Sequence, residues 1–427
     1  MLWMGTVLAI LGAIVCWKRP QMVWWWTLTW AVGLEVIHHW YQGVGQYLPF
    51  AGGAVGALLA MGWSQDSREL MRRAPIVLGL WGLYVLSIIL STLVSIDPAV
   101  SVRYVIGVPV VLGVTLVVLP ALRSRGDLVV SQLLTGMALA GLGLSVVAGA
   151  AALLFGVGFP VPVGHHTLLA WEWPFANKNT LGMLLMYALP SAVALAVWPD
   201  EGRRLRWPWI GMTLWLLLAT ILSYARTAWI AGLAGVAVVL LVRYGKRAFW
   251  AMLIGVVALG GAAVAVTGVK RWQHLWAKGL NGRLGLWQAA LHVLHHHLWL
   301  GVGPGNSPMA IKPFVPAAFA GLTPHDSLLR TAVELGAVGL AIWLMLTISA
   351  LYRLFWGAGA QADPGLRFLG AVLVASVIEQ MAESLLLGGV SFGDYFFTLL
   401  MSMAWMAEAS QPMRRLSVRQ VTRLTGR

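Results

Sequence analysis

A histidine, a carboxylate and an arginine lie together at the start of one apolar segment. In the stretch "GLTPHDSLLRTAVELGAVGL" (321–340), His325 follows Pro324, and Asp326 and Arg330 come before the apolar run. A neutral imidazole is the side chain best matched to removing a hydroxyl proton near pH 7. Two interpretations of His325 are therefore open: a general base, or a ring at a membrane interface. Asp326 is well placed to cap the helix that follows.

Two arginines elsewhere in the chain carry charges suited to phosphate. Arg226, in "ILSYARTAWIAGLAG", lies between two apolar runs, where a charge costs about 2.5 kcal/mol or more at a membrane-helix centre. It either reaches the lipid headgroups or clamps an anion in a cavity. Arg283, in "GLNGRLGLW", opens a helix whose first amides favour an anion, and a solvated surface arginine would also explain it. Because guanidinium groups bind phosphate through paired hydrogen bonds, we expect a lipid diphosphate as the ligand.

Glycines and histidines near these residues give weaker signals. Gly303 and Gly305, in "GVGPGNSP", would let backbone amides approach phosphate, although a glycine–proline turn explains the pattern equally well. His292, His295 and His296 have a spacing suited to a metal ion. No acid or cysteine accompanies them, and consecutive histidines spread around a helix. We therefore expect a site that uses neither a metal ion nor a cofactor.

Two acidic clusters fall in or near predicted membrane helices. Glu379 and Glu383 are one helical turn apart and are expected to line the cavity or to pair with a basic group. Glu35, His38 and His39 form a second cluster near the outer end of an early helix. The sequence assigns neither cluster a role in the chemistry.

The composition requires that membrane helices position these residues. The chain has 427 residues, of which 59% are hydrophobic and 10% are charged, and its mean hydropathy is +0.79. Soluble domains carry roughly 25% charged residues, and a helix needs about 20 apolar residues to cross a bilayer. Apolar runs of this kind recur along the sequence. We therefore predict an all-α, polytopic integral membrane protein with a single membrane domain, 1–427.

Basic connectors predict how the chain threads the membrane. They account for most of the net charge of +14 in the manner of cytoplasmic loops, so we expect no nucleic-acid partner. The connectors are Lys18-Arg19, 68–73, 123–125, 203–206, 243–247, 353–367 and the C-terminal tail. Two apolar helices fit between each neighbouring pair, which predicts twelve membrane helices after residue 20. The run 1–17, which we expect to be retained, is either a thirteenth helix or a segment that does not cross.

The outward-facing segment 270–330 breaks this charge rule. Its basic residues, set against the single acid Asp326, are Lys270, Arg271, Lys278, Arg283, Lys312 and Arg330. Lys178 and Arg226 fall on the same side. A basic outer loop works against the predicted orientation, so we expect it to serve an anionic ligand. Within it, "RLGLWQAALHVLHHHL" (283–298) has apolar positions at near-helical spacing, which predicts an amphipathic helix on the membrane surface.

The order of these motifs resembles that of the bacterial O-antigen ligases and related polymerases. The family pattern is His, then Asn, Ser or Gln, nine residues, and Gly-x-x-Gly. Here His325 and Asp326 precede Gly336 and Gly339 at that spacing, with Asp326 in place of the amide or hydroxyl. Three further segments are similar to family elements: "FANKNTLGMLL" (175–185), "SYARTAW" (223–229) with its Ser-x-x-Arg, and "GRLGLWQAAL…LGVGPGN" (282–306).

The resemblance implies a glycosyl transfer at the periplasmic face of a bacterial inner membrane. The family takes glycan from undecaprenyl diphosphate, and its ligases attach the glycan to a sugar hydroxyl of lipid A–core. By this resemblance His325 would deprotonate the acceptor, Arg226 and Arg283 would bind the leaving diphosphate, and direct attack would invert the anomeric carbon. Substrate-binding roles are expected for Lys178, Asn177, Asn179, Gly303, Gly305, Asp326 and Arg330. The expected partners are therefore the lipid-linked donor, lipid A–core and membrane lipid, with 270–330 as the periplasmic catalytic loop.

Two other classes of function remain open. An O-antigen polymerase or a protein O-oligosaccharyltransferase differs in its acceptor, and the motif at His325 does not separate these from a ligase. We expect no sizeable C-terminal periplasmic domain, which leans against the protein-glycosylating branch. A lipid or polysaccharide transporter would show paired repeats and charges buried at mid-membrane. The sequence shows no internal repeat, and its polar residues gather at the outer edge.

Overall fold

The computed structural model describes most of the chain. The described residues are 2–38, 46–62, 64–73, 75–163, 166–175, 177–198, 206–267, 283–384, 389 and 391–409. In these ranges the regular structure is helical except for one antiparallel β hairpin, in which Phe159 pairs with Ala170 and Val163 with His166. The hairpin was not predicted from the sequence, and it lies in a connection that we predict to face outward.

The elements follow one another as a series of helices on either side of the hairpin. The first half contains α1 (Leu2–Lys18), η1 (Pro20–Met22), α2 (Val23–His38), α3 (Leu48–Met61), α4 (Gln65–Arg73), α5 (Pro75–Leu93), α6 (Pro98–Leu112), the π-helical turn η3 (Gly113–Val118), α7 (Leu119–Arg125) and α8 (Val130–Phe155). The hairpin and the helices after it are β1 (Phe159–Val163), β2 (His166–Ala170), α9 (Lys178–Ala196), α10 (Trp207–Leu222), α11 (Arg226–Tyr244), α12 (Lys246–Thr267), α14 (Arg283–His296), α15 (Ser307–Ile311), η4 (Lys312–Phe314), η5 (Ala317–Phe319), α16 (Ser327–Trp356), α17 (Ala358–Ala362), α18 (Gly365–Glu379) and α19 (Phe392–Ala409).

Six helices among the described residues are long and apolar enough to cross a membrane. They are Pro75–Leu93, Pro98–Arg125, Val130–Phe155, Lys178–Ala196, Arg226–Tyr244 and Ser327–Ala362. Shorter apolar helices are Leu2–Lys18, Leu48–Met61 and Trp207–Leu222. The prediction of an α-helical membrane protein is therefore confirmed. The count of twelve membrane helices and the single domain 1–427 stay predictions.

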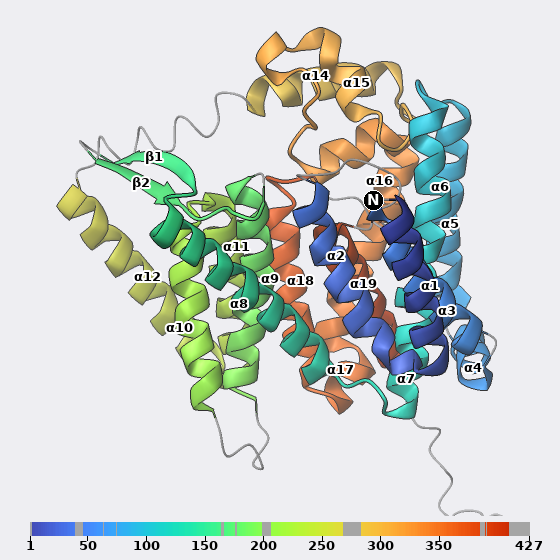
Figure 1. Cartoon of the computed structure of the whole chain (residues 1–427), viewed down its shortest axis with the longest axis horizontal. Helices are drawn as coiled ribbons and strands as arrows, with labels where there is room; N and C mark the ends of the chain where they lie inside the picture. Colours follow the sequence, from blue (N-terminus) through green and yellow to red (C-terminus); the bar gives the residue numbers. More distant parts are fainter. Residues whose placement is uncertain are drawn as a thin grey trace, which may run out of the picture.

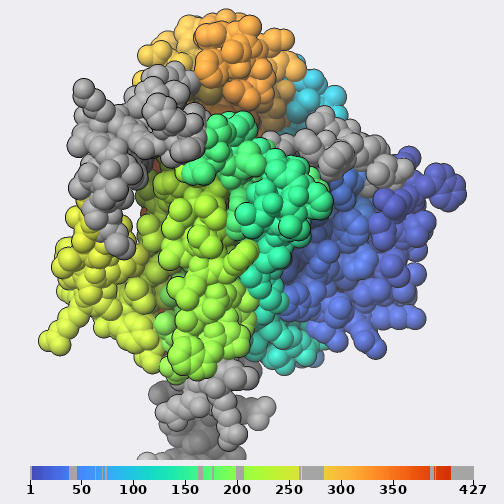
Figure 2. Space-filling model, turned by 60° about the vertical axis from the view of Figure 1, so that its left-hand side comes forward, coloured from blue at the N-terminus to red at the C-terminus, as the bar shows by residue number. Residues whose placement is uncertain are grey.

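The two ends of the helical body carry different elements. The basic connectors in α4 and α7 and the connector around α17 lie at one end, and the β hairpin, α14 and α15 lie at the other (Figure 1). The described residues 283–326, here called the outer cap, stand above the body as a separate lobe, coloured gold to orange in Figure 2. The distribution of basic residues predicts that the connectors and this segment lie on opposite sides of the membrane. In the fold they lie at opposite ends of the helical body (Figure 1).

Helix α9 forms the centre of the body and fixes where its own first residues lie. Nearly all of its residues beyond the first turn are buried, and it packs against α8, α10, α11 and α18. A Cβ added to Gly182 would overlap the Ala225 side chain just before α11, so the two helix starts approach closely. The fold thereby brings Lys178, at the start of α9, next to Arg226, at the start of α11.

Helix α16 is broken at Gly336, and the outer cap fills the break. Gly336 has φ +68° and ψ −173°, a conformation that is essentially restricted to glycine. The interruption exposes carbonyl groups of α16: the Val333 carbonyl accepts from the Val302 amide at 2.9 Å, and the Glu334 carbonyl accepts from the Gly303 amide at 3.0 Å. The first glycine of the His…Gly-x-x-Gly pattern thus joins the outer cap to the helix that begins after His325.

We expect Gly336→Ala to lower the free energy of unfolding by about 3 kcal/mol or more, because the backbone conformation excludes a side chain. The added Cβ would also overlap the Trp299 carbonyl. The thermal unfolding midpoint in detergent measures the loss. Gly79→Ala in α5 is the matched control, since its Cβ meets nothing within 4 Å and alanine favours a helix. Equal midpoints for the two variants would contradict the proposed role of the break.

The predicted amphipathic helix at 283–298 is present as α14 (Arg283–His296), and one of its faces packs on the protein. Its buried residues Leu286, Ala289, Ala290 and Val293 form a small core with Val302, Ala310, Ile311 and Val333. The predicted stripe also included Leu284, Leu291 and Leu298, which are 51%, 54% and 46% exposed. These three recur every seven residues and form a separate row, so α14 docks on the protein through its other face. Contact of α14 with a membrane surface stays a prediction.

Candidate active site

His325 lies in a tight turn directly before α16. Its φ of +52° is in the left-handed region that residues other than glycine seldom adopt, and Asp326 caps the helix by accepting a hydrogen bond from the Leu329 amide at 2.9 Å. On the other side, the Trp287 indole of the outer cap donates to the Pro324 carbonyl at 3.1 Å. Strained backbone of this kind persists only where its surroundings hold it, and it is common at functional sites.

Four hydrogen bonds tie the segment 380–384, which follows α18, to the His325 turn. Their donors lie in 326–330 and their acceptors in 380–384: Asp326 N to Ser384 Oγ (3.2 Å), Ser327 N to Gln380 O (2.8 Å), Ser327 Oγ to Glu383 O (2.9 Å) and Arg330 Nη1 to Ser384 O (2.9 Å). Two of the four are donated by backbone amides, so the two segments are held in register even without their long side chains.

Glu383 contacts functional side chains from three other elements. Its Oε2 lies 3.3 Å from His325 Nδ1, and its Oε1 lies 3.5 Å from Arg283 Nη2 at the start of α14. Asn179, in the first turn of α9, donates from Nδ2 to the same Oε1 at 3.0 Å. The exposed fractions of the Glu383, Arg283 and His325 side chains are 13%, 24% and 28%, so the cluster is shielded but still open to a ligand. Arg283 and His325, far apart in sequence, therefore meet at one carboxylate.

Arg226 joins this cluster from the start of α11. The guanidinium groups of Arg226 and Arg283 interact electrostatically, and the Lys178 ammonium group interacts with Arg226 in the same way. Lys178 Nζ donates at 3.2 Å to the carbonyl of Tyr224, the other residue with a left-handed backbone outside glycine in the described chain, with φ +53°. Repulsion among three cations is relieved by a bound anion, so the arrangement favours a phosphate ligand.

The first turn of α9 supplies the remaining polar groups on this side. Asn177 caps α9 by accepting from the Asn179 amide at 2.9 Å, which leaves the Asn179 side chain to bind Glu383. The Lys178 ammonium group lies 5.1 Å from the centre of the Phe159 ring on β1. Asn177 therefore orders the helix start, and Lys178 and Asn179 are the residues that face the cluster.

A second acid, Glu379, lies one helical turn before Glu383. It is fully buried, and Thr227, next to Arg226, donates from Oγ1 to Glu379 Oε1 at 3.1 Å. No described residue bonds Glu379 Oε2. Both acids were expected to line the cavity or to pair with a basic group, and Glu383 pairs with Arg283. Their position is informative: Thr227 of α11 bonds Glu379, and Arg283 of α14 pairs with Glu383. The first residues of these two helices, Arg226 and Arg283, are the expected phosphate ligands.

Three residues expected to bind substrate have structural partners instead. Arg330 donates from Nε to Glu334 Oε1 at 3.0 Å, and the Gly305 amide donates to Glu334 Oε2 at 2.9 Å. The Gly303 amide donates to the Glu334 carbonyl, and Ser307 Oγ donates to Glu334 Oε1 at 2.6 Å. The glycine–proline segment thus docks on a fully buried carboxylate of α16, and its amides are occupied. We leave Gly303, Gly305 and Arg330 out of the proposed substrate site.

Asp326 acts mainly on the helix that it caps. Burial raises the pKa of its carboxyl group above the ordinary value, and the amides of Leu329 and Leu328 and the charge of Arg283 act against that rise. The side chain bonds the Leu329 amide, which leaves the imidazole of its neighbour to the cluster. Replacement of the family's amide or hydroxyl by a carboxylate at this position is therefore compatible with the turn.

Ring contacts account for the histidines of α14. The His292 ring lies 4.4 Å from Phe314 and 5.0 Å from His296, and His295 lies 5.4 Å from His296. The described residues contain no group of three or more His, Cys, Asp or Glu side chains placed to hold a metal ion. The predicted candidates that lie outside the described residues are His39, Lys270, Arg271 and Lys278, along with the side chain of His38 and the tail from 410.

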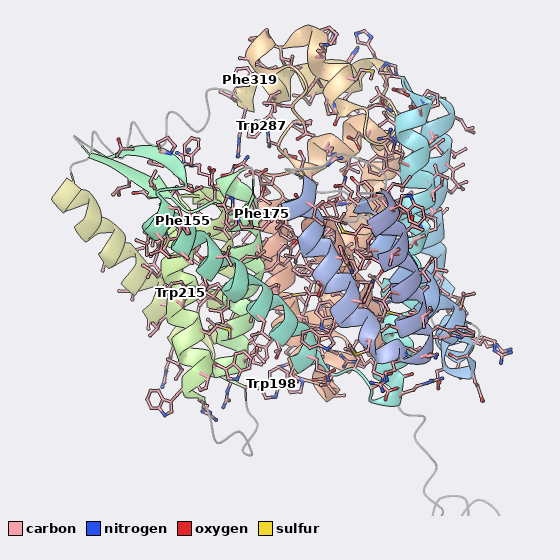
Figure 3. All side chains as sticks on the ribbon, in the orientation of Figure 1. Phe155, Phe175, Trp198, Trp215, Trp287 and Phe319 are labelled. Carbon is pink, nitrogen blue, oxygen red and sulfur yellow. The ribbon has the colours of Figure 1, made fainter. Side chains whose placement is uncertain are left out.

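Figure 3 shows the surroundings of the cluster. Trp287 and Phe319 lie in the outer cap, Phe155 and Phe175 lie at the facing end of the helical body, and Trp198 lies at the opposite end. Lys178, Arg226, Arg283 and His325 each stand at the start of a helix, at or just before its first residue. Helix starts carry unpaired amides and a partial positive charge, which adds to the preference for an anion at this level.

The family comparison matches the part of the chain that supplies three of these residues. Residues 211–344, from α10 into α16, match a family model described as O-antigen ligase. This segment, about a third of the chain, is similar to the O-antigen ligase superfamily. The matched segment contains Arg226, Arg283 and His325, and the resemblance drawn from the sequence is confirmed. No curated protein matches the chain. Glu383 and the start of α9 lie outside the matched segment, so only the fold connects them to it.

Proposed function

We propose that this protein is an O-antigen ligase that transfers glycan from undecaprenyl diphosphate to a sugar hydroxyl of lipid A–core at the periplasmic face of the inner membrane. The observation that carries the proposal is the meeting of His325 and Arg283 at Glu383, with Arg226 close enough to Arg283 for their charges to interact. A base and two guanidinium groups are the parts that a metal-independent displacement at a sugar carbon requires.

The reaction is a single displacement in which the acceptor hydroxyl loses its proton to His325. The hydroxyl oxygen forms a bond to the anomeric carbon while the bond from that carbon to the diphosphate oxygen breaks, and the configuration inverts. The electron pair of the broken bond stays on the diphosphate. Because negative charge grows on that oxygen in the transition state, Arg226 and Arg283 stabilise the transition state more than the bound donor. The proton on the imidazole then passes to solvent.

The start of α9 and the outer cap hold the donor in place. Lys178 extends the cationic surface beyond the two arginines and is the residue that we expect to bind the second phosphate. Asn179 is held by Glu383 and lies within reach of the same ligand. Placing base, nucleophile and leaving group together converts an encounter of two lipids into an effectively intramolecular step, which contributes several kcal/mol, up to about 10, to the lowering of the barrier.

We expect the purified protein to convert rough lipopolysaccharide into a ladder of glycan-bearing species when it is mixed with lipid-linked glycan in EDTA. The ladder on a gel measures the transfer. A ladder that disappears in EDTA and returns with Mg²⁺ would contradict metal independence. Growth of lipid-linked polymer without any acceptor would identify a polymerase, and movement of the donor across vesicles without a new glycosidic bond would identify a transporter.

A further inference from the structure

One carboxylate outside the family-matched segment holds both the base and a phosphate ligand. Glu383 presents Oε2 to His325 Nδ1 and Oε1 to Arg283 Nη2 and Asn179 Nδ2. No described residue bonds His325 Nε2. Hydrogen bonds between 326–330 and 380–384 fix the distance between the two segments, so the pairing of His325 with Glu383 is built into the backbone.

We propose that Glu383 is the positioning residue for the base, a role that rests on the proposed function. A carboxylate only accepts hydrogen bonds, so the hydrogen of a neutral His325 ring is placed on Nδ1, and the lone pair is placed on Nε2. The ring is thereby aimed with its basic nitrogen away from Glu383 and toward the acceptor. When the ring gains the acceptor proton, the carboxylate beside it stabilises the positive charge.

The same carboxylate keeps Arg283 ready for the donor. Its Oε1 lies 3.5 Å from the Arg283 guanidinium, which is long for an ion pair, at a place that a phosphate oxygen can also take. A diphosphate offers Arg283 more oxygen atoms and more charge than Glu383 does. The arginine is therefore expected to move onto the donor while Glu383 keeps its contacts with His325 and Asn179. Donor binding and orientation of the base are linked through one side chain.

The neighbours of Glu383 favour this role over a purely structural one. Glu379 is fully buried and binds Thr227, whereas the Glu383 side chain is partly exposed and binds groups that face the ligand. The structural link between the two segments uses the carbonyl of Glu383 and not its carboxylate. A substitution of the side chain thus leaves the four hydrogen bonds between 326–330 and 380–384 in place.

We expect Glu383→Gln to lower kcat for glycan transfer about 10- to 100-fold, because the amide loses the charge and no longer fixes the ring tautomer. The affinity for undecaprenyl diphosphate, used alone as the probe, should stay the same or rise, since an anion beside Arg283 is removed. Glu383→Asp, which keeps the charge but shortens the reach, should recover part of the rate. In the His325→Ala background, Glu383→Gln should cause no further loss, because a residue that acts through the base has nothing left to position.

Asp66→Asn is the matched control, since Asp66 also pairs with an arginine, Arg125, but at the opposite end of the molecule (Figure 1). Unchanged transfer by Glu383→Gln and Glu383→Asp would overturn the positioning role while leaving the proposed function intact. Loss of diphosphate binding together with kcat, or a full further loss in the His325→Ala background, would show a general structural role instead. Absence of transfer by the unmodified protein would overturn the proposed function itself, and with it the role of Glu383.

Discussion

Replacing His325 with alanine is expected to lower the rate of glycan transfer by about 10³-fold or more, because the acceptor hydroxyl loses the group that takes its proton. Its ring contacts Glu383 at 3.3 Å, and its side chain is 28% exposed. Binding of undecaprenyl diphosphate should persist in the variant, since the arginines remain. An alanine at this position would relieve little of the strain in the left-handed backbone. The thermal unfolding midpoint should therefore change little. The measurement is the initial rate of ladder formation at saturating donor.

His295→Ala supplies the comparison for this variant. It removes an exposed imidazole from α14, where His295 contacts only the ring of His296. Its transfer rate should equal that of the unmodified protein. Activity of His325→Ala close to that of His295→Ala would show that another group accepts the proton. Equal loss in both variants would point to damage of the outer cap.

Replacing either Arg226 or Arg283 with alanine is expected to lower kcat about 10²- to 10³-fold, since each guanidinium stabilises charge that develops on the leaving diphosphate. The corresponding lysine variants should recover only part of the rate, because an ammonium group cannot form the two parallel hydrogen bonds of a guanidinium. Transfer rates and the affinity for undecaprenyl diphosphate, measured on the same preparations, separate binding from chemistry. A loss confined to donor affinity, with kcat unchanged, would assign the arginines to binding alone.

Arg243→Ala is the control for Arg226→Ala because both residues belong to α11. Arg243 lies in the last turn of that helix and donates to the Val197 carbonyl at 3.1 Å, at the end of the body far from the outer cap. An effect of Arg243→Ala as large as that of Arg226→Ala would mean that any charge removed from α11 disturbs the fold. The contrast between the two ends of one helix therefore isolates the contribution of the site.

The reactive groups were predictable because each is costly where it stands. Arg226 is a charge in an apolar run, and Arg283 belongs to a basic loop predicted on the outer side. Both placements are unfavourable unless a function compensates for them, and this argument needs only the sequence. The sequence and the family resemblance also led us to expect that His325, Arg226 and Arg283 converge on one ligand, whereas the acid that joins two of them was not predictable. The contact of Arg283 and His325 with Glu383 joins α14, α16 and the segment after α18, and nothing in local sequence specifies which acid approaches which base.

The glycine residues show why the sequence could not reveal which backbone amides already have partners within the protein. "GVGPGNSP" has the composition of a phosphate-binding loop, and the sequence does not reveal that the amides of Gly303 and Gly305 are taken by Glu334. That competitor lies in α16, and it becomes reachable only because Gly336 breaks the helix. A glycine in the sequence indicates an unusual backbone conformation, whether that backbone binds a ligand or another part of the protein. Which group bonds the glycine amide depends on the tertiary structure.

The break in α16 also sets where the outer cap tolerates changes of length. Hydrogen bonds from 302–307 to 333–334 dock the cap on α16, and residues 302–306 also bond the segment 95–101. The largely exposed stretch 317–322 takes no part in these bonds. Insertions there would lengthen a surface loop, which costs little. One residue added between Gly301 and Asn306 would shift the docking register against α16. We therefore expect the outer cap to tolerate added residues in 317–322 and to lose its docking on α16 when residues are added in 302–305.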